Sequence, residues 1–157
     1  MAIEVGQPAP EFTLLDKDRN QVTLKSFPGK HVVLAFYPLA FTGGCTNEMT
    51  AFRTYTDSFA RANAQVLGVS VDSFASAGEF QKQLGLEFPL LSDFPKNNAG
   101  REYGTYNEDY GIDSRTTVVI DKEGVVRDVY TEARDFESHP THALDVLRGM
   151  GEQPDEG

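Results

Sequence analysis

Length, composition and charge already exclude several classes of protein. A chain of 157 residues can bury a substantial core, and we predict a single domain over residues 1–150 followed by an acidic, disordered tail over residues 151–157. The 24 acidic and 14 basic residues give a formal net charge of -10, which argues against binding to nucleic acid or to an anionic membrane surface.

The N-terminal half predicts a β-hairpin followed by a strand–helix–strand unit. The expected elements are strands at residues 12–15, 21–24, 31–37 and 66–71, and one helix from Cys45 to about Asn63. β-Branched and aromatic residues mark the strand at 31–37, whereas apolar residues at helical spacing mark the helix. A strand, a helix and a second strand in this order form a parallel pair with a right-handed crossover.

The C-terminal half predicts a helical insert, a second hairpin and a last helix. The expected elements are helices over residues 73–85 and 97–103, a short extended piece at 88–93, a polar loop at 107–114, strands at 117–120 and 125–130, and a helix that starts at Pro140. This order of elements predicts an α/β fold with a central mixed β-sheet flanked by helices and an N-terminal β-hairpin.

Cys45 is the only cysteine, and it falls in the first turn of the helix that follows the strand at 31–37. Unpaired amides and the positive end of the helix dipole favour an anion at this position. A lone cysteine excludes an internal disulfide, and it is more often a small buried apolar residue than a nucleophile. Ionising a free thiol with a pKa of ~8.5 can raise its rate at pH 7 only about 30-fold, so a reactive thiol needs further groups around it.

Glu48 makes a cation near Cys45 a requirement. It lies three residues after Cys45 and thus on the same helical face, where an unneutralised carboxylate would oppose a thiolate. The best candidate is Arg115, which ends the polar loop immediately before the strand at 117–120. The planar guanidinium group can bind a carboxylate and still direct an N–H at a sulfur or oxygen atom.

The loop before Cys45 offers further groups for a small polar substrate. The hydroxyl of Thr42 could contact whatever the thiol attacks, although a threonine here is also a common helix cap. Gly43 and Gly44 allow a close approach to the backbone, and Pro38 and Phe41 could keep water from the sulfur. We therefore predict a compact site around Cys45.

These residues carry a resemblance to a known family. Pro38, Thr42 and Cys45 match the motif Pro-x-x-x-Thr-x-x-Cys of the peroxiredoxins, in which a distant arginine, matched by Arg115, opens a core strand. The chain resembles the one-cysteine type, most closely the alkyl hydroperoxide reductase E-like and bacterioferritin-comigratory-protein subgroups. Further similar segments are residues 6–12, 88–93 and 115–121.

The resemblance implies a thioredoxin-like fold and a thiol peroxidase without a cofactor. Cys45 would attack hydrogen peroxide or an alkyl hydroperoxide and form a sulfenic acid. Thr42 and Arg115 would bind the peroxide oxygens, Pro38 would shield the sulfur and Glu48 would orient Arg115. Only the resemblance implies that the substrate is a peroxide.

The chain departs from family members that carry a resolving cysteine five residues after the first, because Thr50 stands at that position. Recycling must then use an external thiol reductant, of the thioredoxin, glutaredoxin or low-molecular-weight type. The resemblance also implies a homodimer, in which Phe41 and Phe74 could face the partner. Since we find neither a secretory signal nor a membrane-spanning stretch, we expect a cytoplasmic protein.

Other functions leave weaker signals. A disulfide oxidoreductase would need a Cys-x-x-Cys motif, and a glutathione-peroxidase-like enzyme would be expected to use a tryptophan, which this chain lacks. His139 and His142 stand beside Pro140 without the carboxylate or cysteine pattern of a metal site. A non-catalytic binding or chaperone protein of the same fold remains the alternative.

Overall fold

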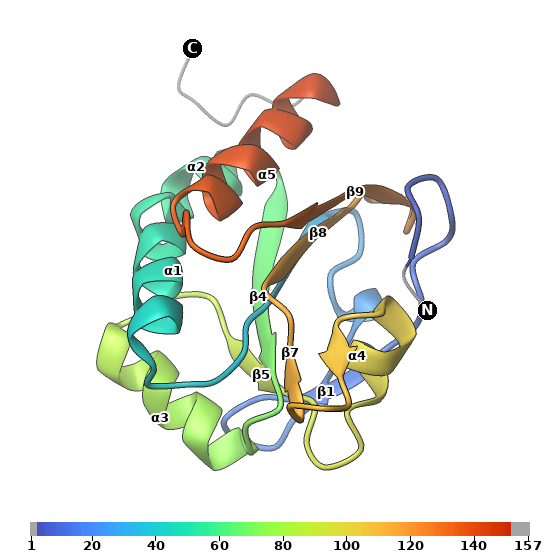
Figure 1. The fold of residues 1–157 in the computed structure, drawn as a ribbon. Helices are drawn as coiled ribbons and strands as arrows, with labels where there is room; N and C mark the ends of the chain where they lie inside the picture. Colours follow the sequence, from blue (N-terminus) through green and yellow to red (C-terminus); the bar gives the residue numbers. More distant parts are fainter. Residues whose placement is uncertain (1–2, 152–157) are drawn as a thin grey trace.

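The computed structural model describes residues 3–151 and contains a seven-stranded mixed β-sheet (Figure 1). Its strands are β1 (Thr13–Leu15), β2 (Gln21–Thr23), β3 (His31–Phe36), β4 (Ala64–Ser70), β5 (Leu90–Ser92), β8 (Thr116–Ile120) and β9 (Val126–Thr131). The strand order is β2-β1-β5-β4-β3-β8-β9, in which β3, β4 and β5 are parallel and all other neighbours are antiparallel. The predicted mixed sheet and N-terminal hairpin are confirmed, and β1 joins the hairpin to the sheet.

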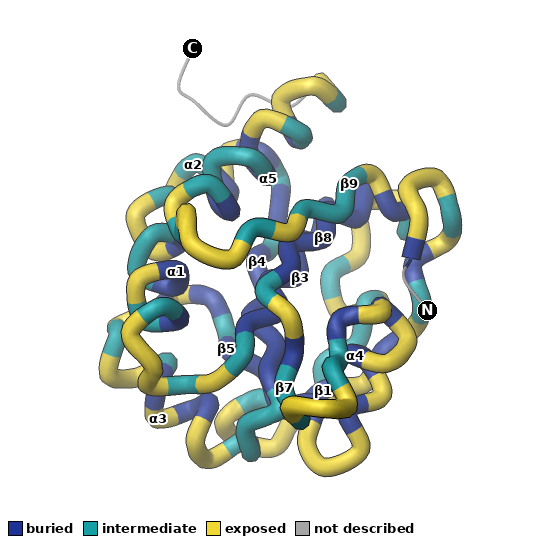
Figure 2. Tube along the Cα trace, in the orientation of Figure 1, coloured by how far each residue is buried: buried dark blue, intermediate teal, exposed yellow. Residues whose placement is uncertain are grey.

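Helices cover both faces of this sheet. They are η1 (Leu24–Ser26), α1 (Gly43–Thr54), α2 (Thr56–Arg61), α3 (Phe74–Leu84), α4 (Asn98–Tyr103) and α5 (Ser138–Gly149). The side chains of β3 alternate between two cores: Val33 packs with residues of α1, α2, α3 and α5, whereas Val32 packs with Tyr103 of α4. β3 is therefore buried along its whole length (Figure 2). No helix within residues 3–151 has the length and apolarity needed to span a membrane.

Three predictions about individual elements were wrong. The long helix ends at Thr54 and a second helix starts at Thr56, because Tyr55 has non-helical backbone angles and threonine hydroxyls on both sides bond back to carbonyl groups of the preceding turn. The polar loop at 107–114 contains most of a small two-stranded sheet, β6 (Tyr106–Asn107) and β7 (Ile112–Asp113). The last helix starts at Ser138, with Pro140 tolerated in its first turn. The tail predicted at 151–157 lies, beyond Gly151, outside the described residues.

The pairing of β3 with β8 determines where the candidate site lies. Phe36, the last residue of β3, is opposite Thr116, the first residue of β8, because these central strands are antiparallel. The loop after β3, which leads into α1, therefore leaves the sheet at the end where Arg115 enters it. This register brings Cys45 and Arg115 together although 70 residues separate them.

Candidate active site

Cys45 lies in the first turn of α1, as predicted, and its sulfur is fully buried. Thr42 is the N-cap residue, and Gly43 and Gly44 complete the start of the helix. The first amides of a helix have no partner inside the helix, so they and the helix dipole favour a negative charge at this end. The side chain of Cys45 also joins the apolar core between the sheet and the helices.

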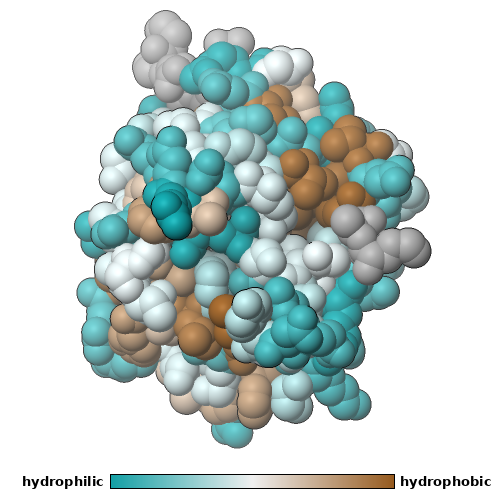
Figure 3. Space-filling model, in the orientation of Figure 1, coloured by the Kyte–Doolittle hydropathy of each residue, from teal (hydrophilic) through white to brown (hydrophobic). Residues whose placement is uncertain are grey.

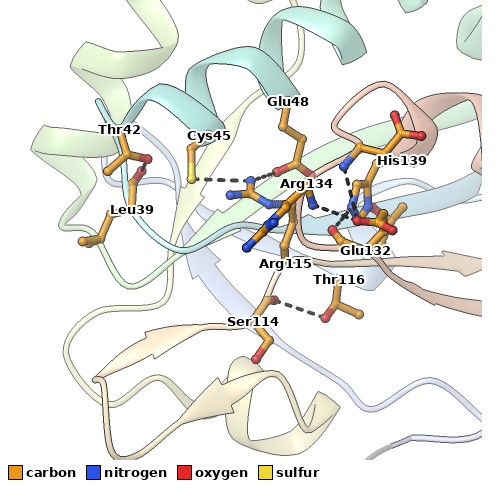
Figure 4. Close-up of polar contacts among 12 residues, drawn as sticks. Leu39, Thr42, Cys45, Glu48, Ser114, Arg115, Thr116, Glu132, Arg134 and His139 are labelled. Atoms are coloured by element: carbon orange, nitrogen blue, oxygen red, sulfur yellow. Dashed lines mark hydrogen bonds and ion pairs between the residues drawn. The ribbon is translucent and has the colours of Figure 1, made fainter.

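Arg115 joins the thiol to Glu48 (Figure 4). Its Nη1 donates to the Sγ of Cys45 at 3.6 Å and to the Oε1 of Glu48 at 2.6 Å. The Arg115 side chain is 11% exposed and that of Glu48 is fully buried, so the ion pair is shielded from water and salt. The structure thus brings together the three residues that the charge argument had linked.

Burial and pairing act in opposite directions on this ion pair. Burial raises the pKa of Glu48 to about 7, although the charge and hydrogen bond of Arg115 pull it down. Burial alone would lower the pKa of Arg115, but Glu48 and the neighbouring Cys45 together raise it. Arg115 is therefore a permanent cation, whereas Glu48 can take up a proton near neutral pH.

The loop residues before Cys45 lie on the other side of the sulfur from Arg115 (Figure 4). The hydroxyl of Thr42 donates to the carbonyl oxygen of Leu39 at 2.9 Å and makes no capping bond to the helix. Phe41 is about half exposed and has a positive φ of 67°, which is uncommon for an aromatic residue and strains the backbone beside Thr42. Pro38 is partly buried at the start of this loop.

Phe136 is a site residue that the sequence did not reveal. It lies between β9 and α5, and its ring centroid is 4.8 Å from the Cζ of Arg115. A Cβ atom at Gly44 would come within 3.0 Å of this ring and within 3.1 Å of the Nη2 of Arg115. Gly44 therefore lets the Phe136 ring and the Arg115 guanidinium pack tightly against the first turn of α1. No local sequence pattern could have predicted Phe136.

A second buried carboxyl group, that of Asp113, precedes Arg115 by two residues and lies in β7. Its Oδ1 accepts a hydrogen bond from the Thr105 hydroxyl at 3.0 Å, whereas its Oδ2 is buried without a hydrogen-bond partner. Burial raises the pKa of Asp113 to about 7, the Thr105 bond lowers it, and the charge of nearby Asp93 raises it further. No sequence argument had identified this group.

The two histidines near Pro140 have different hydrogen-bonding partners, although both rings contact Tyr130. The Nδ1 of His139 lies 2.8 Å from the Thr117 hydroxyl and its Nε2 lies 2.7 Å from the carbonyl oxygen of Glu132. His142 instead pairs with Asp128 at 2.8 Å. Among residues 3–151, no group of three or more His, Cys, Asp or Glu side chains could hold a metal ion.

Comparisons with known proteins identify the family of this chain. Residues 5–129 match the AhpC/TSA family. The chain is 40% identical to the chloroplastic peroxiredoxin Q of Oryza sativa subsp. japonica over 149 residues, which is 94% of this chain and 68% of that protein. It is also 40% identical to alkyl hydroperoxide reductase E of Mycobacterium bovis over 127 residues, covering 80% of this chain and 83% of that protein.

A solved structure gives the same result for the fold. The crystal structure of peroxidoxin BcpB from Mycobacterium tuberculosis superposes with a TM-score of 0.88 at 31% identity and covers 94% of this chain and 98% of that chain. The family match includes β3, α1 with Cys45, and Arg115 before β8. The chain therefore belongs to the AhpC/TSA family and is a peroxiredoxin with a thioredoxin-like fold.

Proposed function

We propose that this thiol-dependent peroxidase reduces hydrogen peroxide and organic hydroperoxides through a sulfenic acid at Cys45. The thiolate attacks the terminal peroxide oxygen in line with the O–O bond. A sulfur–oxygen bond forms as the oxygen–oxygen bond breaks, and the leaving oxygen takes up a proton to become water or an alcohol. The thiol is oxidised and the peroxide is reduced by the same two electrons.

The observation that carries the proposal is the single guanidinium nitrogen of Arg115 that contacts both Cys45 and Glu48. The other nitrogens of its fork can then donate to a peroxide oxygen as negative charge develops there. The hydroxyl of Thr42 already donates to Leu39, so its lone pairs are free to accept the peroxide O–H. Thr42 and Arg115 would thus hold the peroxide from two sides, with Pro38 helping to exclude water.

Regeneration of Cys45 uses an external thiol, because the chain has no second cysteine. A thiolate from the reductant attacks the sulfenic sulfur, releases water and forms a mixed disulfide. A second thiol then cleaves that disulfide and returns Cys45 to its reduced form. The reductant is a thioredoxin, a glutaredoxin or a low-molecular-weight thiol, in keeping with a one-cysteine enzyme in a reducing cytoplasm.

We also propose that the enzyme works as a homodimer. Large apolar side chains are exposed beside the site, at Leu39 and Phe41, while Phe74 is partly covered by Arg19. On the face drawn in Figure 3, apolar residues likewise gather in patches among hydrophilic ones. Sedimentation of the reduced protein over a range of concentrations would measure the dimer, and a Phe41→Asp variant that is as dimeric as the wild type would count against a contact through Phe41.

The first test of the proposed function is Cys45→Ser, which should abolish peroxide reduction with hydrogen peroxide and with an alkyl hydroperoxide. Arg115→Ala should lower the second-order rate of Cys45 oxidation by about 10²–10³, the cost of removing one donor that stabilises transition-state charge. The rates should be compared on their high-pH plateau, where ionisation no longer limits the reaction. Turnover in Cys45→Ser would refute the proposal, and an unchanged plateau in Arg115→Ala would limit Arg115 to ionising the thiol.

The alternative, a non-catalytic binding protein, is not favoured, since it gives no reason to bury an arginine against the thiol. Mass spectrometry after one equivalent of hydrogen peroxide separates the two functions. Rapid formation of a sulfenic adduct at Cys45, trapped with dimedone, supports the enzyme. A thiol that reacts no faster than free cysteine supports the binding protein.

A further inference from the structure

We propose that Phe136 is a positioning residue for peroxide reduction, which holds the guanidinium of Arg115 against Cys45 and Glu48 by capping its outer face. The inference rests on the proposed role of Arg115. It starts from the stacked arrangement of the Phe136 ring, the guanidinium group and the first turn of α1 at Gly44, which are all in close contact.

The Phe136 ring fixes the orientation of the Arg115 guanidinium, which the hydrogen bonds of Nη1 alone leave free. Nη1 of Arg115 has two acceptors, Glu48 and Cys45, whereas its Nε is buried without a hydrogen-bond partner. An arginine held at one nitrogen can still rotate about that contact. An aromatic face at 4.8 Å attracts the cation through its quadrupole and prevents that rotation.

The segment that carries Phe136 is itself firmly anchored. The hydroxyl of Ser138 donates to the carbonyl oxygen of Asp135 at 2.6 Å and accepts from the Tyr130 hydroxyl at 2.8 Å. These bonds join the segment to β9 on one side and to the start of α5 on the other. Phe136 is thus presented from a fixed backbone, which a positioning role requires.

His139 connects this segment to β8, the strand that directly follows Arg115. A carbonyl oxygen can only accept, so Nε2 of His139 must donate to Glu132, and in the neutral ring Nδ1 accepts from the Thr117 hydroxyl. Thr117 lies two residues after Arg115 on β8, and Glu132 lies four residues before Phe136. One imidazole ring therefore links the strand that follows Arg115 to the segment that carries Phe136.

The test compares an aromatic with an aliphatic residue of similar size. Phe136→Leu keeps the apolar volume but loses the ring face, and we expect the second-order rate of Cys45 oxidation to fall 5- to 10-fold. Phe136→Tyr keeps the ring and should stay within twofold of the wild type. Tyr106→Leu removes an aromatic ring that lies 4.6 Å from the guanidinium of Arg101 rather than of Arg115, and serves as the matched control with an unchanged rate.

A double-mutant cycle separates positioning from general damage. In an Arg115→Lys background, where the planar fork is already lost, Phe136→Leu should cost less than twofold. Equal losses in both backgrounds, or a wild-type rate in Phe136→Leu, would overturn the inference. Urea denaturation of each variant checks that the fold is retained. Failure of the proposed function would instead appear as a wild-type protein that does not reduce peroxide.

Discussion

Two buried carboxyl groups, Glu48 and Asp113, have different surroundings. Glu48 lies against the guanidinium of Arg115, whereas Asp113 has a hydroxyl from Thr105 and the like charge of Asp93 nearby. Burial raises the pKa of both groups to about 7. One carboxyl group therefore remains largely buried next to a cation, and the other without one.

The difference shows how a buried charge can be structural in one place and part of the chemistry in another. At Glu48 the ionised form has a use, because it holds a donor of Arg115 beside Cys45. Each carboxyl group has one buried oxygen without a hydrogen-bond partner, but the ionised form of Asp113 faces the like charge of Asp93 where Glu48 has a cation, and this costs free energy. We therefore expect ionisation to support activity at Glu48 and to weaken the fold at Asp113.

The largest expected effect is on stability after removal of the cation. Arg115→Ala leaves the buried Glu48 without its cation, so that at pH 8 its carboxyl group must either stay as an unpaired charge or take up a proton, and the free energy of unfolding should fall by about 3–5 kcal/mol. The loss should shrink at pH 5, where Glu48 is protonated, and a second change, Glu48→Gln, should restore part of it at pH 8. Urea denaturation of the reduced proteins measures these values. An equal loss at both pH values would show that the charge of Glu48 is not the cause.

Asp113→Asn should instead raise the free energy of unfolding. The pKa of Asp113 is raised in the folded state, so the folded protein holds this proton more tightly than the unfolded chain does. This contribution to stability is present below about pH 4 and is lost as the pH rises to about 7. The variant should therefore be more stable than the wild type by roughly 2–4 kcal/mol at pH 8 and should show no gain at pH 4. A variant that is less stable at pH 8 would reveal a favourable partner for the carboxylate.

The smallest expected effect is on the rate of Cys45 oxidation, which we compare between variants of Glu48 and of Asp113. Glu48→Gln keeps an acceptor for Arg115 but loses the charge, and we expect a rate about tenfold lower at pH 8, because a hydrogen bond to a charged group contributes about 1.5–3 kcal/mol and a neutral one about 1. At pH 6 the wild-type carboxyl is itself protonated, so the two rates should converge. Asp113→Asn is the matched control and should stay within twofold at both pH values. A constant ratio from pH 6 to pH 8 would contradict the role of the charge.

Much of this arrangement could be predicted from local patterns. The strand before Cys45, the helix after it and the Gly85 end of α3 each follow from periodicity or from a residue with a known backbone preference. Arg115 could be predicted because Glu48 lies on the same helical face as the thiol and needs a neutralising partner. A charge argument predicts a distant residue in this way only when the other member of the ion pair is already known.

The remainder depends on packing between distant segments. The break at Tyr55 follows from threonine hydroxyls that bond to nearby backbone carbonyl groups and compete with the hydrogen bonds of the helix. The spacing of apolar residues carries no information about such bonds. Phe136 and Asp113 act through partners eight or more positions away in the chain, namely Arg115 for Phe136 and Thr105 and Asp93 for Asp113. Neither residue stands in a motif that would identify it.

Because the Cys45 sulfur is fully buried, the peroxide and the reductant differ in how easily they can reach it. A peroxide brings only a few atoms to the sulfur, whereas a reductant must place its own sulfur in line with the new S–O bond. A protein thiol is far larger than a peroxide, so the burial of Cys45 excludes it more strongly than the small substrate. The burial of one sulfur atom thus discriminates between the two reaction partners by their size.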